Sequence, residues 1–189
     1  MQNIIKNMIQ ESAETAKLCE ALSPKIEKAA KLVANAFNNK KKILLAGNGG
    51  SSSQASHIAA EFVGRYKLER KGMPAIALTA DMAAITAISN DYGFEAVFER
   101  QIESLANEGD VLIVLSTSGN SANIIKAVEK AKKMNIHVIA LLGKDGGKMK
   151  NISNVEIIVP SNNTPRIQES HLMILHIICE LVDNQLFEK

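Results

Sequence analysis

A histidine and a glutamate stand four positions apart, at His57 and Glu61, in a segment that is otherwise mostly apolar. Residues at i and i+4 share one face of an α-helix, so the two side chains would point the same way. Such a pair can act as acid and base, ligate a metal ion, or form a surface hydrogen bond, which is the usual case for an isolated pair. Polar groups among apolar residues need partners, and the last apolar segment offers Gln168, His171 and His176. Isoleucine and leucine flank His176, so from that segment alone a core histidine bonded to a backbone carbonyl is the simpler interpretation.

Two segments rich in glycine and hydroxyl groups could bind a phosphate. Residues 47–53 follow an apolar run at 43–46 and precede a predicted helix at 55–63, with the serines expected at its N-terminal cap. Residues 116–121 follow an apolar run at 111–115 and precede another predicted helix. The N-terminus of a helix offers backbone N–H groups and a positive dipole end to an anion. Ser and Thr also cap helices without binding anything, but four hydroxyls within six residues favour a phosphate monoester.

The common nucleotide-binding motifs fail in the first of these segments. Both the P-loop, GxxxxGK[ST], and the dinucleotide motif, GxGxxG, need a glycine where Ser52 stands. Residues 143–147, with the sequence GKDGG, lack the pattern as well. A small sugar phosphate therefore suits this chain better than a nucleotide.

The elements that must position these residues are short apolar strands that alternate with helices. Nearly all-apolar strands between helices predict an α/β fold, a three-layer sandwich whose five-stranded parallel sheet is covered on both faces. Ligands of such sheets bind beyond the carboxyl ends of the strands, where both hydroxyl-rich segments would lie. Strands are predicted at 43–46, 74–79, 111–115, 137–142 and 155–159, and a closing helix from Thr164 to about residue 187.

Local signals predict further boundaries between the second and third strands. Asp81 should cap a helix over residues 82–88, and the polar residues 89–93 should end it. A helix at 94–105 should turn Phe94 inward together with Val97, Phe98 and Ile102.

Two helices are predicted before the first strand, at residues 2–20 and from residue 23 onward. Neither has a place in a strand–helix–strand unit, so we expect the first one to pack on another subunit. We interpret the chain as one domain, with N-terminal helices at 1–40 and an α/β core at 41–189. The apolar stripe of the first helix comprises Ile5, Met8, Ile9, Ser12, Ala16 and Cys19.

The composition is that of an ordinary globular protein. The 189 residues are 46% hydrophobic and 22% charged, enough for one compact core. A net charge of +2 gives no reason to expect nucleic acid or an anionic membrane as a partner, and no apolar run approaches the ~20 residues of a membrane span. Cys19 and Cys179 resemble reduced core residues, which indicates a cytoplasmic protein.

Several longer motifs cover nearly the whole chain. They are GNGGS (47–51), HxxAE (57–61), GRY (64–66), PAIAL (74–78), ND-GF (90–94), EGDVL (108–112), STSGNSANIIKA (116–127), GKDGGKM (143–149) and RIQE…H (166–176). They are similar to those of the sugar isomerase (SIS) superfamily, and closely to its phosphoheptose isomerase family. The resemblance implies a homotetramer with one Zn²⁺ in each active site. It also implies an aldose–ketose isomerase that converts D-sedoheptulose 7-phosphate into D-glycero-D-manno-heptose 7-phosphate through an enediol, the first step of nucleotide-activated heptose synthesis for lipopolysaccharide, capsule or S-layer.

The resemblance also assigns roles to individual residues. Glu61 matches the catalytic base and His176 the partner acid. Two positions depart from the family pattern, because Gln54 stands where many members have Asp and Pro165 where some have an acidic residue. The positions that match the zinc ligands are His57, Glu61, Gln168 and His176. Those that match substrate contacts are Asn48, Gly49, Gly50, Ser51, Glu61, Arg65, Asn90, Asp91, Ser116, Thr117, Ser118, Ser121 and Gln168.

The spacing of two of these ligands limits how they can meet. Gln168 and His176 lie eight residues apart in one predicted helix, which corresponds to a rise of ~12 Å and a turn of ~80°. Bonds to zinc are only ~2.0–2.2 Å long. Either the helix begins after Gln168, or one of the two ligands comes from a neighbouring chain. Nothing in the sequence breaks the helix, so we expect active sites at subunit interfaces.

Other functions within the superfamily provide the alternatives. One relative is a non-catalytic adaptor that binds a replication initiator protein, and its C-terminal end resembles residues 183–187. That branch lacks the equivalents of Glu61 and His176, both of which are present here. A sensor domain of a transcription regulator is a third alternative, but residues 1–40 show no basic recognition helix. These comparisons favour the enzyme.

Overall fold

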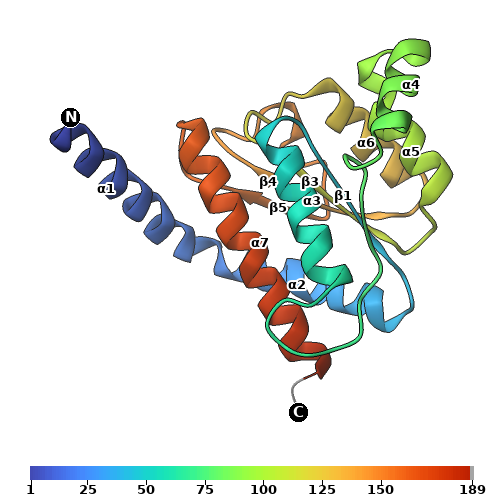
Figure 1. Ribbon diagram of the computed structural model, residues 1–189, viewed down its shortest axis with the longest axis horizontal. Helices are drawn as coiled ribbons and strands as arrows, with labels where there is room; N and C mark the ends of the chain where they lie inside the picture. The colour runs from blue at the N-terminus through green and yellow to red at the C-terminus, as the bar shows by residue number, and fades with distance from the viewer. Residues whose placement is uncertain (188–189) are drawn as a thin grey trace.

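Five parallel strands form the centre of the molecule (Figure 1). The computed structural model describes residues 1–187 of the chain. The strand order is β2-β1-β3-β4-β5, the flavodoxin-like order of doubly wound sheets. The register places Ile43 beside both Ala75 and Val111, and Val111 beside His137. The strands are β1 (Ile43–Gly47), β2 (Ala75–Ala77), β3 (Val111–Ser116), β4 (His137–Leu142) and β5 (Val155–Ile158).

Helices cover both faces of the sheet. Side chains alternate across a strand, so Ile43 and Leu45 belong to one core while Leu44 and Ala46 belong to the other. Helices α2, α3 and α7 pack on the first face, and α5 and α6 on the second. The predicted three-layer α/β sandwich is therefore confirmed. The bounds are α2 (Ser23–Asn38), α3 (Gly50–Val63), α5 (Val97–Leu105), α6 (Ala122–Lys133) and α7 (Thr164–Phe187).

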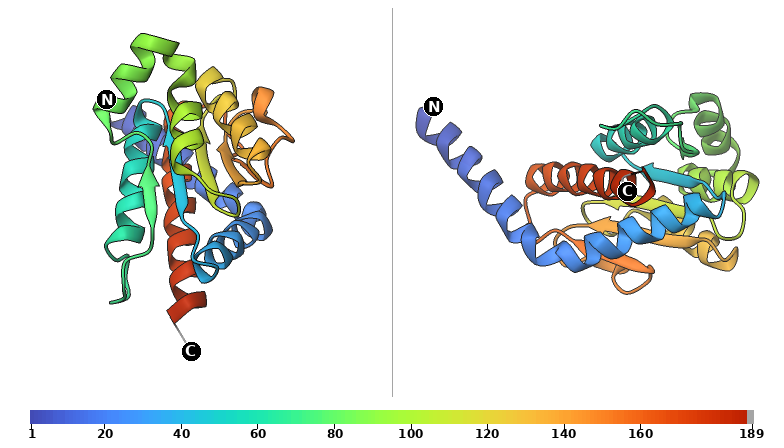
Figure 2. Two further views of the ribbon diagram at one scale, coloured as in Figure 1. Left: turned by 90° about the vertical axis from the view of Figure 1, so that its right-hand side faces the viewer. Right: turned by 90° about the horizontal axis from the view of Figure 1, so that it is seen from below.

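Helix α1 (Gln2–Leu18) projects from the body of the molecule (Figures 1 and 2). A 3-10 turn, Cys19–Leu22, joins it to α2. Polar contacts hold its middle to the start of α7: Arg166 Nη1 donates to the Met8 carbonyl over 2.6 Å, and Ser12 Oγ donates to Glu169 over 2.7 Å. The described chain leaves the N-terminal part of its apolar stripe uncovered, because Ile5, Met8 and Ile9, and Ile4 beside them, are all more than half exposed.

Two predicted helices have wrong boundaries. Helix α3 begins at Gly50, with Gly49 (φ 56°) as its N-cap, so residues 51–53 lie inside the first turns instead of capping them. Helix α4 (Met82–Tyr92) starts at the Asp81 cap as predicted, since Asp81 accepts from the Ala84 N–H, but it continues through the polar residues to Gly93 (φ 84°). These polar side chains are half-buried or exposed, where a helix tolerates them.

The predictions for Phe94 and for the second strand are also wrong. Phe94 lies in a 3-10 turn, Phe94–Ala96, and is 56% exposed, so it does not point inward as expected. Strand β2 has three residues, half the predicted length. Cys19 and Cys179 are free and buried, as predicted. Among the helices of residues 1–187, none combines the length and apolar character that crossing a membrane requires.

Candidate active site and metal centre

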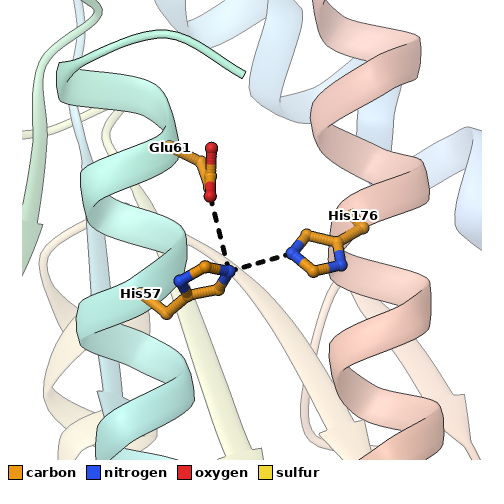
Figure 3. Close-up of side chains that lie close together, drawn as sticks. All are labelled: His57, Glu61 and His176. Carbon is orange, nitrogen blue, oxygen red and sulfur yellow. Dashed lines mark hydrogen bonds and ion pairs between the residues drawn. The ribbon is translucent and has the colours of Figure 1, made fainter. Parts of the chain in front are cut away.

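Helices α3 and α7 bring three potential ligands together (Figure 3). His57 and Glu61 lie one turn apart on α3, and His176 faces them from α7. His57 Nε2 lies 3.0 Å from His176 Nε2 and 3.4 Å from Glu61 Oε1. One ligand atom from each residue lies within 4.8 Å of the others. The i, i+4 pair therefore has a third partner and is more than a surface hydrogen bond.

The spacing of these atoms suits a small metal ion. A tetrahedral ion with bonds of ~2.0–2.2 Å holds its ligand atoms ~3.3–3.6 Å apart, close to the spacings of 3.0 and 3.4 Å here. Two imidazoles and a carboxylate form an N/O donor set that zinc accepts. Burial lowers the pKa of His176, and the neighbouring His57 lowers it further, which favours the neutral ring that a metal needs. The group can hold a metal ion.

The residue that matches a core histidine is His171, not His176. Its ring is fully buried, and its Nε2 lies 3.0 Å from the carbonyl oxygen of Leu142 at the end of β4. Burial lowers its pKa to about 4. His171 is a structural residue that joins α7 to the sheet.

The two glycine- and hydroxyl-rich loops lie side by side at the carboxyl edge of the sheet. Gly47, the last residue of β1, pairs with Leu115 near the end of β3. Just beyond this pair, Asn48 and Asn123 exchange two amide hydrogen bonds of 2.9 Å. The N-termini of α3 and α6 both begin here, so their dipoles and free N–H groups converge on one edge.

The hydroxyl groups of the loop at 116–121 do not cap helix α6. Ser121 is the N-cap of α6, yet its side chain makes no capping hydrogen bond. Ser116 Oγ accepts from the Gly119 N–H over 3.1 Å, and Ser118 Oγ accepts from the Asn120 N–H over 3.2 Å. An accepting hydroxyl keeps its own hydrogen to donate, although one of the Ser116 and Ser121 hydroxyls can donate to the other over 3.4 Å. The ordinary capping interpretation therefore fails for Ser121, and the loop can donate to an anion.

The loop at 143–149 is hydrogen-bonded to the loop at 116–121. The Met149 N–H donates to the Gly119 carbonyl over 3.1 Å, and the Lys148 N–H donates to Asn120 Oδ1 over 3.1 Å. Gly119 has φ +64°, and a Cβ added there would overlap the Gly146 carbonyl, so only glycine fits.

Gln168 lies with the glycine loop and not with the three converging ligands. A Cβ built on Gly50 would lie 2.9 Å from Gln168 Nε2, and Gln54 Nε2 donates to the Gln168 carbonyl. Helix α7 runs unbroken from Thr164, which excludes the possibility that it begins after Gln168. Pro165 occupies the first turn, where proline is tolerated.

Three other predicted contact residues lie elsewhere in the chain. Arg65 follows the C-terminal end of α3 and pairs with Glu69 over 3.4 Å, with its side chain 58% exposed. The glycine loop lies at the opposite end of α3, roughly 20 Å away along the axis. Asn90 and Asp91 occupy the exposed last turn of α4, where Asn90 Nδ2 donates to Asp91 over 2.8 Å.

Sequence reasoning missed three residues that support the site. Asn123 is a buried polar residue on the otherwise apolar face of α6, a signal that could have identified it. Tyr66 stacks on His176, with ring centroids 5.6 Å apart and planes at 21°. Arg70 is buried against the end of α3. Neither Tyr66 nor Arg70 lies in a periodic segment, so no pattern indicated their partners.

Comparison with known proteins gives consistent matches over most of the chain. The SIS domain family model matches residues 9–143. The phosphoheptose isomerase of Nitratiruptor sp. is 52% identical over 183 residues, covering 97% of this chain and 98% of its own length, and that of Aliarcobacter butzleri is 50% identical, covering 97% of each. The solved phosphoheptose isomerase of Neisseria gonorrhoeae superposes with a TM-score of 0.91 at 42% identity, over 97% of this chain and 98% of that one.

Proposed function

The chain belongs to the SIS domain family and, within it, to the phosphoheptose isomerases, and we propose that it converts D-sedoheptulose 7-phosphate into D-glycero-D-manno-heptose 7-phosphate. This reaction would begin the synthesis of nucleotide-activated heptose. The observation that carries the proposal is the convergence of His57, Glu61 and His176 in a fold that also presents a hydroxyl-rich anion site. The buried thiols suggest a cytoplasmic setting, in which they would stay reduced.

The proposed chemistry needs a base, an acid and positive charge beside the reacting oxygens. In our proposal Glu61 removes a proton from C1 of the ketose and returns it to C2, through an enediol. His176 moves the hydroxyl proton between O1 and O2, and its lowered pKa leaves the neutral ring free to accept it. The proton lost from C1 and the proton gained at C2 balance, so the product is an isomer.

His57, Glu61 and His176, completed by Gln168, would hold a Zn²⁺ ion. When bound, this ion supplies Lewis-acid polarisation of the sugar oxygens. A carboxylate engaged as a ligand is a weaker base, so we expect Glu61 to take its proton with a carboxylate free of the ion. Its side chain is 22% exposed, which leaves room for that movement.

The phosphate would bind at the carboxyl edge of the sheet. Ser116, Thr117, Ser118 and Ser121 would donate from one loop, and backbone N–H groups at 48–51 from the other. The Asn48–Asn123 pair supports this assignment, because it holds the two loops at a constant spacing. We call these two loops, residues 47–51 and 116–121, the phosphate cradle.

The distances within one chain support a proposal that active sites are shared between subunits. The backbones of Gly50 and Glu61 lie eleven residues apart on α3, a rise of ~16 Å, so a sugar phosphate bound at both would have to lie along most of the helix. We therefore propose that His57, Glu61 and His176 of one chain act on a sugar held by the cradle of another, which also donates Gln168. The exposed stripe of α1 supports association into a homotetramer. Arg65, Asn90 and Asp91, exposed in one chain, would complete the site across the interface.

The test is incubation of the purified protein with sedoheptulose 7-phosphate after chelation, with and without added zinc. Formation of the aldose can be followed by NMR. We expect turnover that depends on zinc; a zinc-reconstituted protein that leaves the substrate unchanged would contradict the proposal. No observation favours the adaptor function, because the base and the acid are both present and converge.

A further inference from the structure

The segment that leaves α3, residues 64–72, lies along α7 and contacts it three times. We call this segment the strap. Tyr66 stacks on His176, Lys67 Nζ pairs with Glu180 over 2.8 Å, and Arg70 Nε donates to Asp183 over 2.7 Å. Positions 176, 180 and 183 follow the i, i+4, i+7 spacing of one helix face. The strap therefore joins the helix that carries His57 and Glu61 to the helix that carries His176.

Arg70 makes contacts of a different kind from the rest of the strap. Its side chain is 1% exposed, and its guanidinium reaches back to the last turn of α3. Nη2 donates to the carbonyl of Glu61 over 3.0 Å, and Nη1 donates to those of Phe62 and Gly64 over 3.1 and 3.2 Å. The last carbonyls of a helix lack partners within the helix, and a cation suits the negative end of its dipole. One planar group thus holds the end of α3 and, through Asp183, α7.

Stability alone is a weak reason for this arrangement. Burying two charges costs desolvation energy, and apolar residues of similar size often stabilise a protein as well or better. Among the described residues, Asp183 Oδ2 has no hydrogen-bond partner although it is buried. An apolar pair, however, could not donate a hydrogen bond to the backbone carbonyl of Glu61, as Arg70 does. Lysine could not supply it either, because a single ammonium lacks the guanidinium fork.

We propose that Arg70, together with Asp183, is a positioning residue that sets the spacing of α3 and α7 so that His57, Glu61 and His176 can hold one metal ion. This inference rests on the zinc site of the proposed function. The other ion pair of the strap offers a matched control: Lys67 and Glu180 also join the strap to α7, but their side chains are 61% and 45% exposed, and Lys67 does not cap α3.

The test is zinc affinity, measured by competition with a chelating dye on the full-length protein. The main variant, Arg70→Met with Asp183→Leu, replaces the pair by apolar side chains. We expect it to fold with a melting temperature near that of the wild type, yet to bind zinc about 10–100-fold more weakly, the usual effect of removing a group that orients metal ligands. We expect Lys67→Met to leave the zinc affinity unchanged. In turnover assays at saturating zinc, kcat should fall more than KM rises, because the phosphate cradle is untouched.

Each outcome decides a separate point. Wild-type zinc affinity in the folded double variant would overturn the positioning role. A wild-type protein that binds no zinc would instead overturn the metal site, and the inference with it. If the double variant does not fold, Asp183→Asn keeps the packing but removes the charge. We expect that variant to bind zinc more weakly than the wild type, and an unchanged affinity there would equally overturn the role.

Discussion

Acidification should destabilise the protein through His171. Burial lowers its pKa to about 4 from the ordinary histidine value of 6.5. Between these values the unfolded chain binds a proton that the folded chain does not, so stability falls as the pH falls from 6.5 toward 4. At pH 5, about 1.5 units below the pKa of the unfolded chain, this difference in proton binding corresponds to a loss of about 2 kcal/mol of unfolding free energy relative to pH 7.

The measurement is urea unfolding of chelated protein at pH 7 and pH 5, at one fixed protein concentration because the proposed subunit association would contribute to stability. The comparison is with His171→Gln, whose amide can still donate to the Leu142 carbonyl but does not titrate. Other groups also change stability over this range, so the informative quantity is the difference between wild type and variant. We expect the wild type to lose about 2 kcal/mol more than the variant. Equal losses would show that His171 is not the buried neutral group described above.

Three further predictions concern the site. Glu61→Gln should keep the fold but lower kcat by ~10²–10⁴-fold, since it removes the proton acceptor; turnover like that of the wild type, in a steady-state assay, would exclude Glu61 as the base. Replacing Ser116 and Ser118 by Ala should weaken sugar-phosphate binding, measured by calorimetry, by roughly 1.5–3 kcal/mol for each lost bond to the charged group. A lower melting temperature with unchanged affinity would instead mean that these hydroxyls only shape the loop. Mixing the Glu61→Gln protein with the Ser116→Ala/Ser118→Ala protein should restore part of the activity, and no recovery in verified mixed oligomers would refute shared sites.

Much of the fold could be predicted because its signals are local. The strand at 137–142 and the helix from Thr164 have the predicted bounds, since apolar runs and breaking residues mark both. The errors at the helix boundaries lie where a single glycine with a positive φ sets the start or the end of a helix. Gly49, with φ 56°, starts α3 earlier than the serines suggested, and Gly93 ends α4 later than the polar residues suggested. The extent of the domain, 1–189, stays a prediction.

The site could be predicted only in part from the residues themselves. Spacing placed His57 and Glu61 on one face, and the structure agrees. Their partner His176 is 119 residues away from His57, and periodicity cannot show that α3 and α7 pack together; the family resemblance suggested it. Arg70 and Tyr66 act from a non-repetitive segment, where no sequence pattern indicates a contact.

A family resemblance assigns residues to a site without saying which chain supplies each one. The structure separates the predicted residues into groups: the cradle with Gln168, the three converging ligands, and the exposed Arg65, Asn90 and Asp91. The spacing argument left open whether Gln168 or His176 comes from the neighbour. His176 lies 3.0 Å from His57 of its own chain, so in our proposal Gln168 is the ligand that a neighbouring chain donates. In the proposed mechanism, the strap would keep the three ligands of one chain together, and the fourth ligand would come from the chain that holds the substrate.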